Sequence, residues 1–78
     1  MADIEIFTGP NCGYCREAKR LLDAGGYAYR EHDVSQPDAQ ALMRARLPRA
    51  RSIPQIFVDG VHLGGSDDLA ARLAQGPL

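Results

Sequence analysis

The chain has 78 residues, and nine Lys and Arg against ten Asp and Glu give a formal net charge of -1. A chain of this length has room for one small core, so we expect residues 1–78 to form a single domain. The balanced charge excludes the basic field that binds nucleic acid or an anionic membrane surface. No apolar stretch approaches the roughly 20 residues of a membrane span, and the acidic start lacks the pattern of a secretory signal. We therefore expect a cytoplasmic protein.

The first half of the chain alternates between strand and helix patterns. Residues 4–7 form a short apolar run that predicts a strand, and residues 8–11 have the composition of a loop. Apolar residues at 15, 18, 21 and 22 then recur at intervals of three and four, which predicts an amphipathic helix over residues 13–24. Residues 27–34 alternate between apolar and polar side chains and predict a half-buried second strand.

Residues 35–38 have the composition of a helix start, and the second helix is predicted to run from there to about Leu47 and to stop at Pro48. Proline is tolerated in a first turn, and Ser35 or Asp38 can cap the helix by accepting a hydrogen bond from a backbone N–H group. Residues 49–53 are basic and irregular.

A hairpin and a helix complete the chain. Residues 55–58 are a compact apolar strand, and Asp59-Gly60 predicts a tight turn into a return strand over residues 61–63. The last helix is predicted over residues 69–74, with Ser66 or Asp67 as its cap. The order is βαβαββα. A helical crossover makes the first two strands parallel, and the hairpin adds an antiparallel pair. The expected fold is α/β and thioredoxin-like, a four-stranded mixed sheet flanked by helices, although the order of elements alone does not exclude other small α/β arrangements.

The two cysteines of the chain form the motif Cys12-Gly13-Tyr14-Cys15 at the start of the first predicted helix. Unpaired N–H groups and the positive end of the helix dipole stabilise a thiolate there, so Cys12 is expected to be the attacking thiolate. Cys15 lies one helical turn further, on the apolar face, where it can attack a mixed disulfide formed on Cys12. It is the expected resolving thiol, and an exposed Tyr14 ring would flank the substrate.

Two other interpretations of the cysteine pair carry less weight. Zinc takes four ligands, and only His32 and His62 remain as further donors of the usual kind, without a second close-spaced pair. Two inert core cysteines are the other alternative. The position of the motif between a strand and a helix favours redox chemistry over both.

Three segments, in this order and spacing, resemble the glutaredoxin family over nearly the whole chain. They are residues 6–15 (Ile-Phe-Thr-Gly-Pro-Asn-Cys-Gly-Tyr-Cys), 52–60 (Ser-Ile-Pro-Gln-Ile-Phe-Val-Asp-Gly) and 62–69 (His-Leu-Gly-Gly-Ser-Asp-Asp-Leu). The resemblance implies that Pro54 is cis and faces Cys12. It also implies that the backbone of Ile53 pairs with the cysteinyl part of glutathione, in the manner of strand addition.

The resemblance further implies a site for the γ-glutamyl end of glutathione at the start of the last helix. Backbone N–H groups there suit its carboxylate, and Asp67 suits its ammonium group. Helix capping is the alternative role of Asp67 and Asp68, and it is compatible with binding. The implied glutathione-binding residues are Tyr14, Ser52, Ile53, Pro54, Gly65, Ser66, Asp67 and Asp68.

The sequence departs from the family in two places. Residues 9–11 lack the lysine that often precedes the first cysteine and helps bind the glycine carboxylate of glutathione, and Arg49 or Arg51 is a candidate substitute. Gly13 replaces a common proline. Related glutaredoxins with glycine there hold a 2Fe-2S cluster between two subunits, through the first cysteine of each and two glutathiones. A homodimer bridged by such a cluster on Cys12 is therefore an alternative to the expected monomer without a metal.

The expected function is glutathione-dependent reduction of protein disulfides and of protein–glutathione mixed disulfides. Cys12 attacks the substrate sulfur, and Cys15 or a second glutathione resolves the product. One alternative is a carrier or sensor of a 2Fe-2S cluster. Another is a thioredoxin-like electron donor served by a flavoprotein reductase, against which the run Gly65-Ser66-Asp67-Asp68 argues, because a glutathione site needs that segment.

Overall fold

The computed structural model describes residues 2–78, and Met1, where the expected domain begins, lies outside this range. The element order βαβαββα confirms the prediction. The elements are β1 Ile4–Thr8, α1 Gly13–Ala24, β2 Arg30–Asp33, α2 Pro37–Arg46, β3 Gln55–Val58, β4 Val61–Gly64 and α3 Ser66–Leu73. None of the helices in residues 2–78 is long and apolar enough to cross a membrane.

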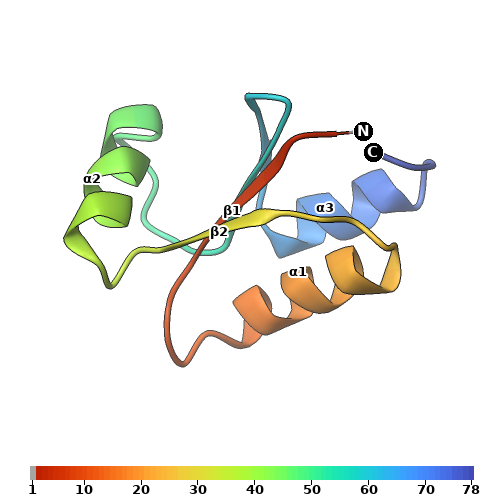
Figure 1. Ribbon diagram of the computed structural model, residues 1–78, viewed down its shortest axis with the longest axis horizontal. Coiled ribbons are helices and arrows are strands. Elements are labelled where there is room, and N and C mark those ends of the chain that lie inside the picture. Colours follow the sequence, from red (N-terminus) through yellow and green to blue (C-terminus); the bar gives the residue numbers. More distant parts are fainter. Residues whose placement is uncertain (1) are drawn as a thin grey trace.

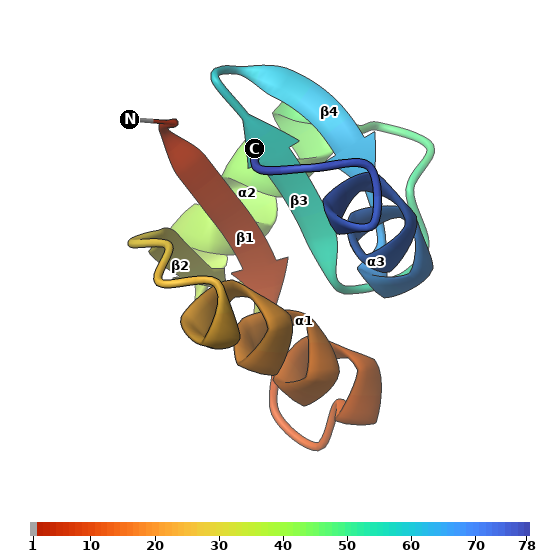
Figure 2. The same ribbon diagram turned by 90° about the vertical axis from the view of Figure 1, so that its right-hand side faces the viewer.

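The strands form a four-stranded sheet in the order β2-β1-β3-β4. β1 is parallel to its neighbour β2 and antiparallel to its neighbour β3. β3 and β4 are antiparallel to each other. This mixed sheet confirms the predicted thioredoxin-like architecture. Helices α1 and α3 cover one face of the sheet and α2 covers the other (Figures 1 and 2).

The main core lies between the sheet and the pair α1 and α3. Side chains alternate along a strand, so every second residue of β1 and β3 points into it. Its buried members are Ile4, Ile6, Ala18, Leu22, Ile56 and Leu69. Because Ala18 and Leu22 are one helical turn apart, they present one continuous apolar surface of α1 to the sheet. The apolar spacing that predicted α1 therefore defines the helix face that is buried.

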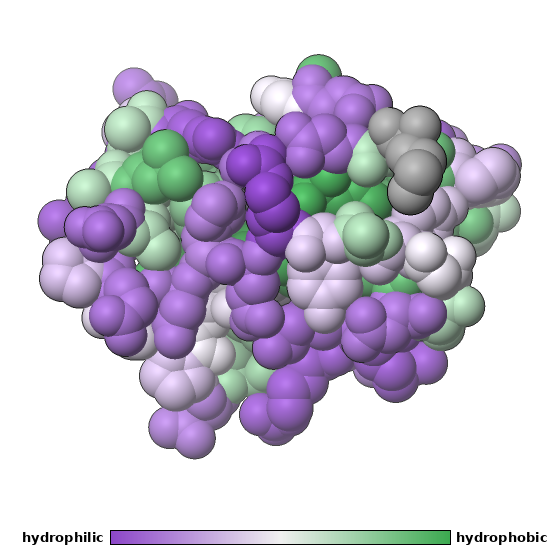
Figure 3. Space-filling model, viewed as in Figure 1, coloured by the Kyte–Doolittle hydropathy of each residue, from purple (hydrophilic) through white to green (hydrophobic). Residues whose placement is uncertain are grey.

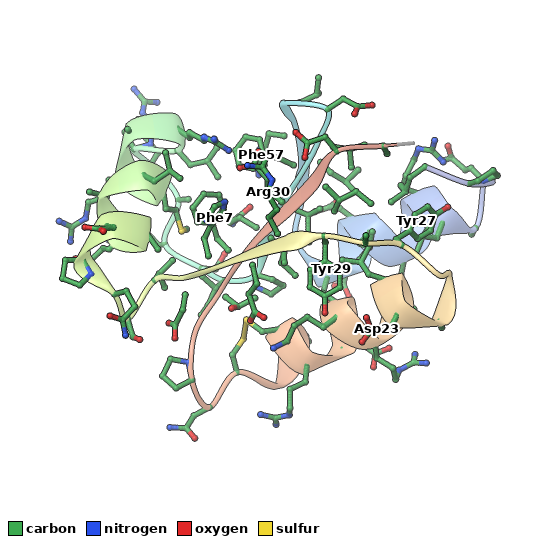
Figure 4. The ribbon with its side chains drawn as sticks, viewed as in Figure 1. Phe7, Asp23, Tyr27, Tyr29, Arg30 and Phe57 are labelled. Atoms are coloured by element: carbon green, nitrogen blue, oxygen red, sulfur yellow. A yellow bond between two sulfur atoms is a disulfide. The ribbon has the colours of Figure 1, made fainter. Side chains whose placement is uncertain are left out.

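The opposite face of the sheet is partly polar. Glu5 on β1 has only 4% of its side chain exposed, and its carboxylate accepts a hydrogen bond from Nη1 of Arg46 at 2.9 Å. The carboxylate also lies 3.0 Å from Nε2 of His32. The Arg46 guanidinium lies over the rings of Phe7 and Phe57, with centroid distances of 5.9 and 5.2 Å. Figure 4 shows both rings between the sheet and α2. Arg46 thus holds α2 against the sheet by a charge pair and by ring contacts.

β2 is shorter than predicted, and the strand over residues 27–34 was wrong at its start. Tyr27 lies in the turn that ends α1, where its N–H donates to the carbonyl oxygen of Leu22 at 3.0 Å. Its hydroxyl accepts a hydrogen bond from the N–H of Leu78 at 2.8 Å. Pairing with β1 begins only at Arg30, opposite Glu5. Tyr27 and Tyr29 are partly buried and pack against the core, which accounts for the alternating pattern of residues 27–29 without a strand.

The caps predicted for the last two helices were also wrong. α2 begins at Pro37 after Gln36, which makes no capping hydrogen bond through its side chain, so neither Ser35 nor Asp38 caps it. The N-cap of α3 is Gly65, and Ser66 and Asp67 are already helical. The Asp68 carboxylate accepts a hydrogen bond from the N–H of Gly65 at 2.9 Å. This bond moves the start of α3 three residues ahead of the prediction.

Replacing Glu5 by Gln should lower the free energy of unfolding by about 2 kcal/mol near pH 7, because the Arg46 hydrogen bond loses its charge. Arg46, as the main cause, holds the pKa of the Glu5 carboxyl below its ordinary value of 4.5. Because folding lowers this pKa, the ionised carboxylate stabilises the folded state at pH values above its ordinary pKa. This contribution is lost as the pH falls through the lowered pKa.

Urea unfolding of the wild type and of Glu5→Gln, near pH 7 and at about pH 3, measures this effect. The difference in free energy of unfolding between the two proteins should shrink at the lower pH. Arg44→Gln is a matched control on the same helix and should change stability by less than about 0.5 kcal/mol. An equal loss at both pH values would mean that Glu5 acts through packing and not through its charge.

Candidate active site

The antiparallel pairing of β1 with β3 brings the two loops of the site together. Phe7 lies opposite Gln55, so the loop that leaves β1 is adjacent to the loop that enters β3. Sγ of Cys12 lies 3.8 Å from the carbonyl oxygen of Ile53, across 41 positions of sequence. The Ile53–Pro54 peptide is cis, as the resemblance implied. A Cβ atom at Gly9 would come within 2.8 Å of Cδ1 of Ile53, so glycine permits the close approach of the loops.

Cys12 and Cys15 form a disulfide, with their Cα atoms 5.2 Å apart. Cys12 is the N-cap of α1, and its Sγ accepts a hydrogen bond from the N–H of Cys15 at 3.1 Å. No acidic residue occupies the first turn of α1, so no carboxylate there opposes a negative charge on Cys12. The N–H of Cys15, at this helix start, stabilises a thiolate on Cys12 once the disulfide is reduced.

The two cysteines differ in access to solvent. Cys12 is half-buried, whereas Cys15 is 2% exposed and packs on the buried side of α1. Figure 4 shows the disulfide at the first turn of α1, next to the loop that follows β1. An incoming substrate can reach Cys12 but not Cys15, which supports their assignment as attacking and resolving thiol.

A cleft next to Cys12 brings together all eight of the other residues that the resemblance implied. Its lining residues are Tyr14, Ser52, Ile53, Pro54, Gly65, Ser66, Asp67 and Asp68. They come from three separate segments: α1, the loop before β3 and the start of α3. Tyr14 is 69% exposed and forms one wall beside the cysteine pair. Agreement between the two sets makes this cleft the candidate binding site.

The start of α3 divides the roles of the two aspartates. The Asp68 carboxylate bonds the N–H of Gly65, so Asp68 caps the helix. Asp67 is exposed, lines the cleft and makes no such bond, so its carboxylate is not used in capping the helix. The next backbone N–H groups of α3, those of Ser66 and Asp67, belong to the first turn, where N–H groups lack intrahelical partners and suit an anion.

Neither arginine proposed as a substitute for the missing lysine lines this cleft. Arg51 lines a neighbouring groove, which shares Ser52 and Ile53 with the cleft. Arg49 lines neither of these two depressions.

Sequence reasoning missed two residues that hold the loop before β3. Nε2 of Gln55 donates to the carbonyl oxygen of Ser52 at 3.1 Å, and Gln55 is itself only 8% exposed. His62 on β4 donates from Nε2 to Oε1 of Gln55 at 2.7 Å. The chain Ser52, Gln55, His62 thus fixes the loop that lines the cleft. The signal available was a polar residue at the start of an otherwise apolar strand.

A second missed network supports the end of β1. Thr8 is buried, and its hydroxyl donates to the Glu31 carboxylate at 2.6 Å, while Nζ of Lys19 lies 2.9 Å from the same oxygen. The Thr8 hydrogen bond, followed by that of Lys19, holds the pKa of Glu31 below its ordinary value. This network joins β1, β2 and α1 just before the chain reaches Cys12. Lys19 and Cys15 are four residues apart and share one helix face.

A cysteine pair separated by two residues, at a helix start and facing a proline loop in a thioredoxin-like fold, defines a thiol–disulfide oxidoreductase. The family model for glutaredoxin matches residues 4–63. The chain belongs to the glutaredoxin family.

Characterised relatives agree over the full length. The chain is 38% identical over 78 residues to glutaredoxin 3 of Escherichia coli K12, covering 100% of this chain and 94% of that protein. It is 42% identical over 81 residues to a glutaredoxin of Neisseria meningitidis, covering 100% and 93%.

Solved structures agree as well. The solution structure of a Brucella melitensis glutaredoxin is 44% identical, has a TM-score of 0.78 and aligns over 97% of this chain and 83% of that one. A buckwheat glutaredoxin–glutathione complex is 30% identical, has a TM-score of 0.80 and aligns over 96% and 71%.

In the reduced protein, iodoacetamide should alkylate Cys12 at least about tenfold faster than Cys15 near neutral pH, because Cys12 is accessible and is stabilised as a thiolate. Peptide mass spectrometry of samples quenched over time measures both rates. In urea the two rates should converge, which provides the control. Equal rates in the folded protein would contradict the division of roles.

Proposed function

We propose that the protein is a glutathione-dependent disulfide oxidoreductase that reduces protein disulfides and glutathione mixed disulfides. The observation that carries the proposal is the cleft beside Cys12. Eight residues from three segments line it, and they are the eight that the resemblance to the family implied for glutathione binding. The neighbouring structure of buckwheat glutaredoxin, a complex with glutathione, supports the same substrate.

Glutathione would lie across the cleft with its sulfur at Cys12. Its cysteinyl backbone would pair with Ile53, whose carbonyl oxygen is 3.8 Å from Sγ of Cys12. Its γ-glutamyl carboxylate would accept hydrogen bonds at the amino end of α3, and its ammonium group would pair with Asp67. Arg51, which lines the adjoining groove, is the basic residue that we propose for the glycine carboxylate.

The reaction transfers two electrons from thiols to the substrate disulfide. The Cys12 thiolate attacks one sulfur of the substrate disulfide, and the other sulfur leaves as a thiolate that takes a proton from solvent. For a protein disulfide, Cys15 loses its proton and attacks Sγ of Cys12, which releases the second substrate thiol and forms the observed Cys12–Cys15 disulfide. Two glutathione molecules then reduce this disulfide and leave as glutathione disulfide. For a glutathione mixed disulfide, a second glutathione resolves the adduct on Cys12 directly.

The Cys15→Ser variant should retain reduction of glutathione mixed disulfides and lose reduction of protein disulfides, because only the second reaction needs a resolving thiol in the same chain. Cys12→Ser should lose both activities. Coupled assays with a glutathionylated peptide and with a protein disulfide measure the two reactions. Equal loss of both in Cys15→Ser would contradict the proposed division of labour.

Asp67→Asn should raise the KM for a glutathione mixed disulfide by roughly threefold to tenfold, because the ammonium group loses its charged partner. The kcat should change little, since the reacting sulfurs are not touched. Asp68→Asn is the matched control, because its amide oxygen still accepts the Gly65 hydrogen bond. A KM that rises equally in both variants would assign the effect to the helix start as a whole.

The iron–sulfur alternative needs donors from outside one chain. Within residues 2–78, no group of three or more His, Cys, Asp and Glu is placed to hold a metal ion. A 2Fe-2S cluster on Cys12 would therefore require a second copy of the chain and two glutathiones, and a brown, glutathione-dependent dimer is its marker. We propose a monomeric, single-domain enzyme acting in the cytoplasm, where glutathione and thioredoxin systems keep thiols reduced.

A further inference from the structure

A second depression adjoins the glutathione cleft, on the other side of the loop before β3. This groove lies between α2 and residues 50–53, and it shares Ser52 and Ile53 with the cleft. A molecule bound at Cys12 can therefore extend from one depression into the other without leaving the surface. The proposed glutathione site accounts for the cleft, but the length of the groove along α2 remains without a role.

The groove combines an apolar floor with a basic border. Val34, Met43 and Leu47 are all partly buried and provide apolar surface. Arg44 and Arg51 border it, and its lining contains no acidic residue. Figure 3 shows hydrophobic side chains at the surface of α2 with hydrophilic ones around them. An apolar side chain with carboxylates beside it would complement such a surface.

The charge of this region is concentrated, although the whole chain is nearly neutral. Residues 39–58 contain four arginines and no Asp or Glu. Arg46 is paired with Glu5, but within residues 2–78 the remaining three, at 44, 49 and 51, form no ion pair. Basic residues near a helix end also interact with the helix dipole. That explanation covers Arg44 in the last turn of α2, but not Arg51, which lies beyond it.

The orientation of a bound chain follows from the proposed function, on which this step rests. The amino-terminal, γ-glutamyl end of glutathione lies at the start of α3, and its cysteine lies at Cys12. A polypeptide bound through its own cysteine in the same direction would place the residues that follow this cysteine beyond Ile53. These residues enter the groove.

We propose that the groove is the docking site for the polypeptide segment that follows the reactive cysteine in a protein disulfide. An apolar side chain of this segment packs on Met43 and Leu47, and acidic side chains pair with Arg44 and Arg51. The preferred protein substrates therefore carry acidic and apolar residues on the carboxyl side of the cysteine. The smaller glutathione does not reach the floor along α2.

A single-turnover reaction with reduced protein and no glutathione tests the proposal. The substrates are blocked peptides Gly-Cys-Glu-Leu-Asp and Gly-Cys-Lys-Leu-Lys, each as a mixed disulfide with 5-thio-2-nitrobenzoate. Cys12 attacks the peptide sulfur and releases the coloured thiolate, and Cys15 then displaces the peptide thiol. The mixed disulfide of 2-mercaptoethanol with the same leaving group is the substrate without flanking residues.

The acidic peptide should react roughly threefold to tenfold faster than the basic one, and the preference should fall at high salt. Arg44→Glu should abolish or invert the preference and leave the mercaptoethanol substrate unchanged. Arg20→Glu makes the same change in net charge on the exposed side of α1 and should keep the preference. Replacing leucine in the acidic peptide by glycine should slow wild type, and Met43→Ala should reduce that difference.

Equal rates for the two peptides, or a preference that Arg44→Glu leaves intact, would overturn the docking site. Even if the docking site is overturned, a loss of reaction with every substrate in Cys12→Ser, and in no other variant, would still support the proposed thiol chemistry. The assay contains no glutathione, so a failure of glutathione dependence does not affect it. Thermal melting of each variant before the assay ensures that a lost preference is not caused by unfolding.

Discussion

The antiparallel pairing of β1 with β3 is the constraint on which the site depends. Because Phe7 lies opposite Gln55, the chain leaves β1 toward Cys12 at the same end of the sheet at which it enters β3 from Pro54. A shift of this register by one residue would turn every side chain of one strand to the other face of the sheet. Buried Ile6 and Ile56, directly opposite each other, hold the register, and the contact between Cys12 and Ile53 follows from it.

The parts that the sequence predicted well are those decided by neighbouring residues. The apolar spacing set α1 correctly, and Asp59-Gly60 set the hairpin of β3 and β4. The parts that failed depend on distant partners. Tyr27 alternates like a strand residue, but its N–H completes α1 and its hydroxyl bonds the last residue of the chain. The eight cleft residues came from a resemblance, whereas the support from Gln55 could only be found once β3 and β4 were placed side by side.

Charge is distributed unevenly around the reactive sulfur. Asp67 lines the cleft, and Arg44 and Arg51 line the adjoining groove, which shares Ser52 and Ile53 with the cleft. A polypeptide segment with acidic residues beyond its cysteine complements the arginines of the groove. The ion pair of Arg46 with buried Glu5 fixes α2 against the sheet. The helix that this pair anchors also carries Arg44 at the border of the groove.

The electron donor of the protein distinguishes a glutathione-dependent reductase from the alternatives. The protein, purified without oxygen and with its visible spectrum recorded, would be supplied with a disulfide substrate and either glutathione with glutathione reductase or thioredoxin reductase alone. We expect a colourless protein that turns over with glutathione and not with thioredoxin reductase. Turnover with thioredoxin reductase alone, or weak turnover by a brown dimer, would contradict this expectation and assign the protein to electron donation or to cluster carriage.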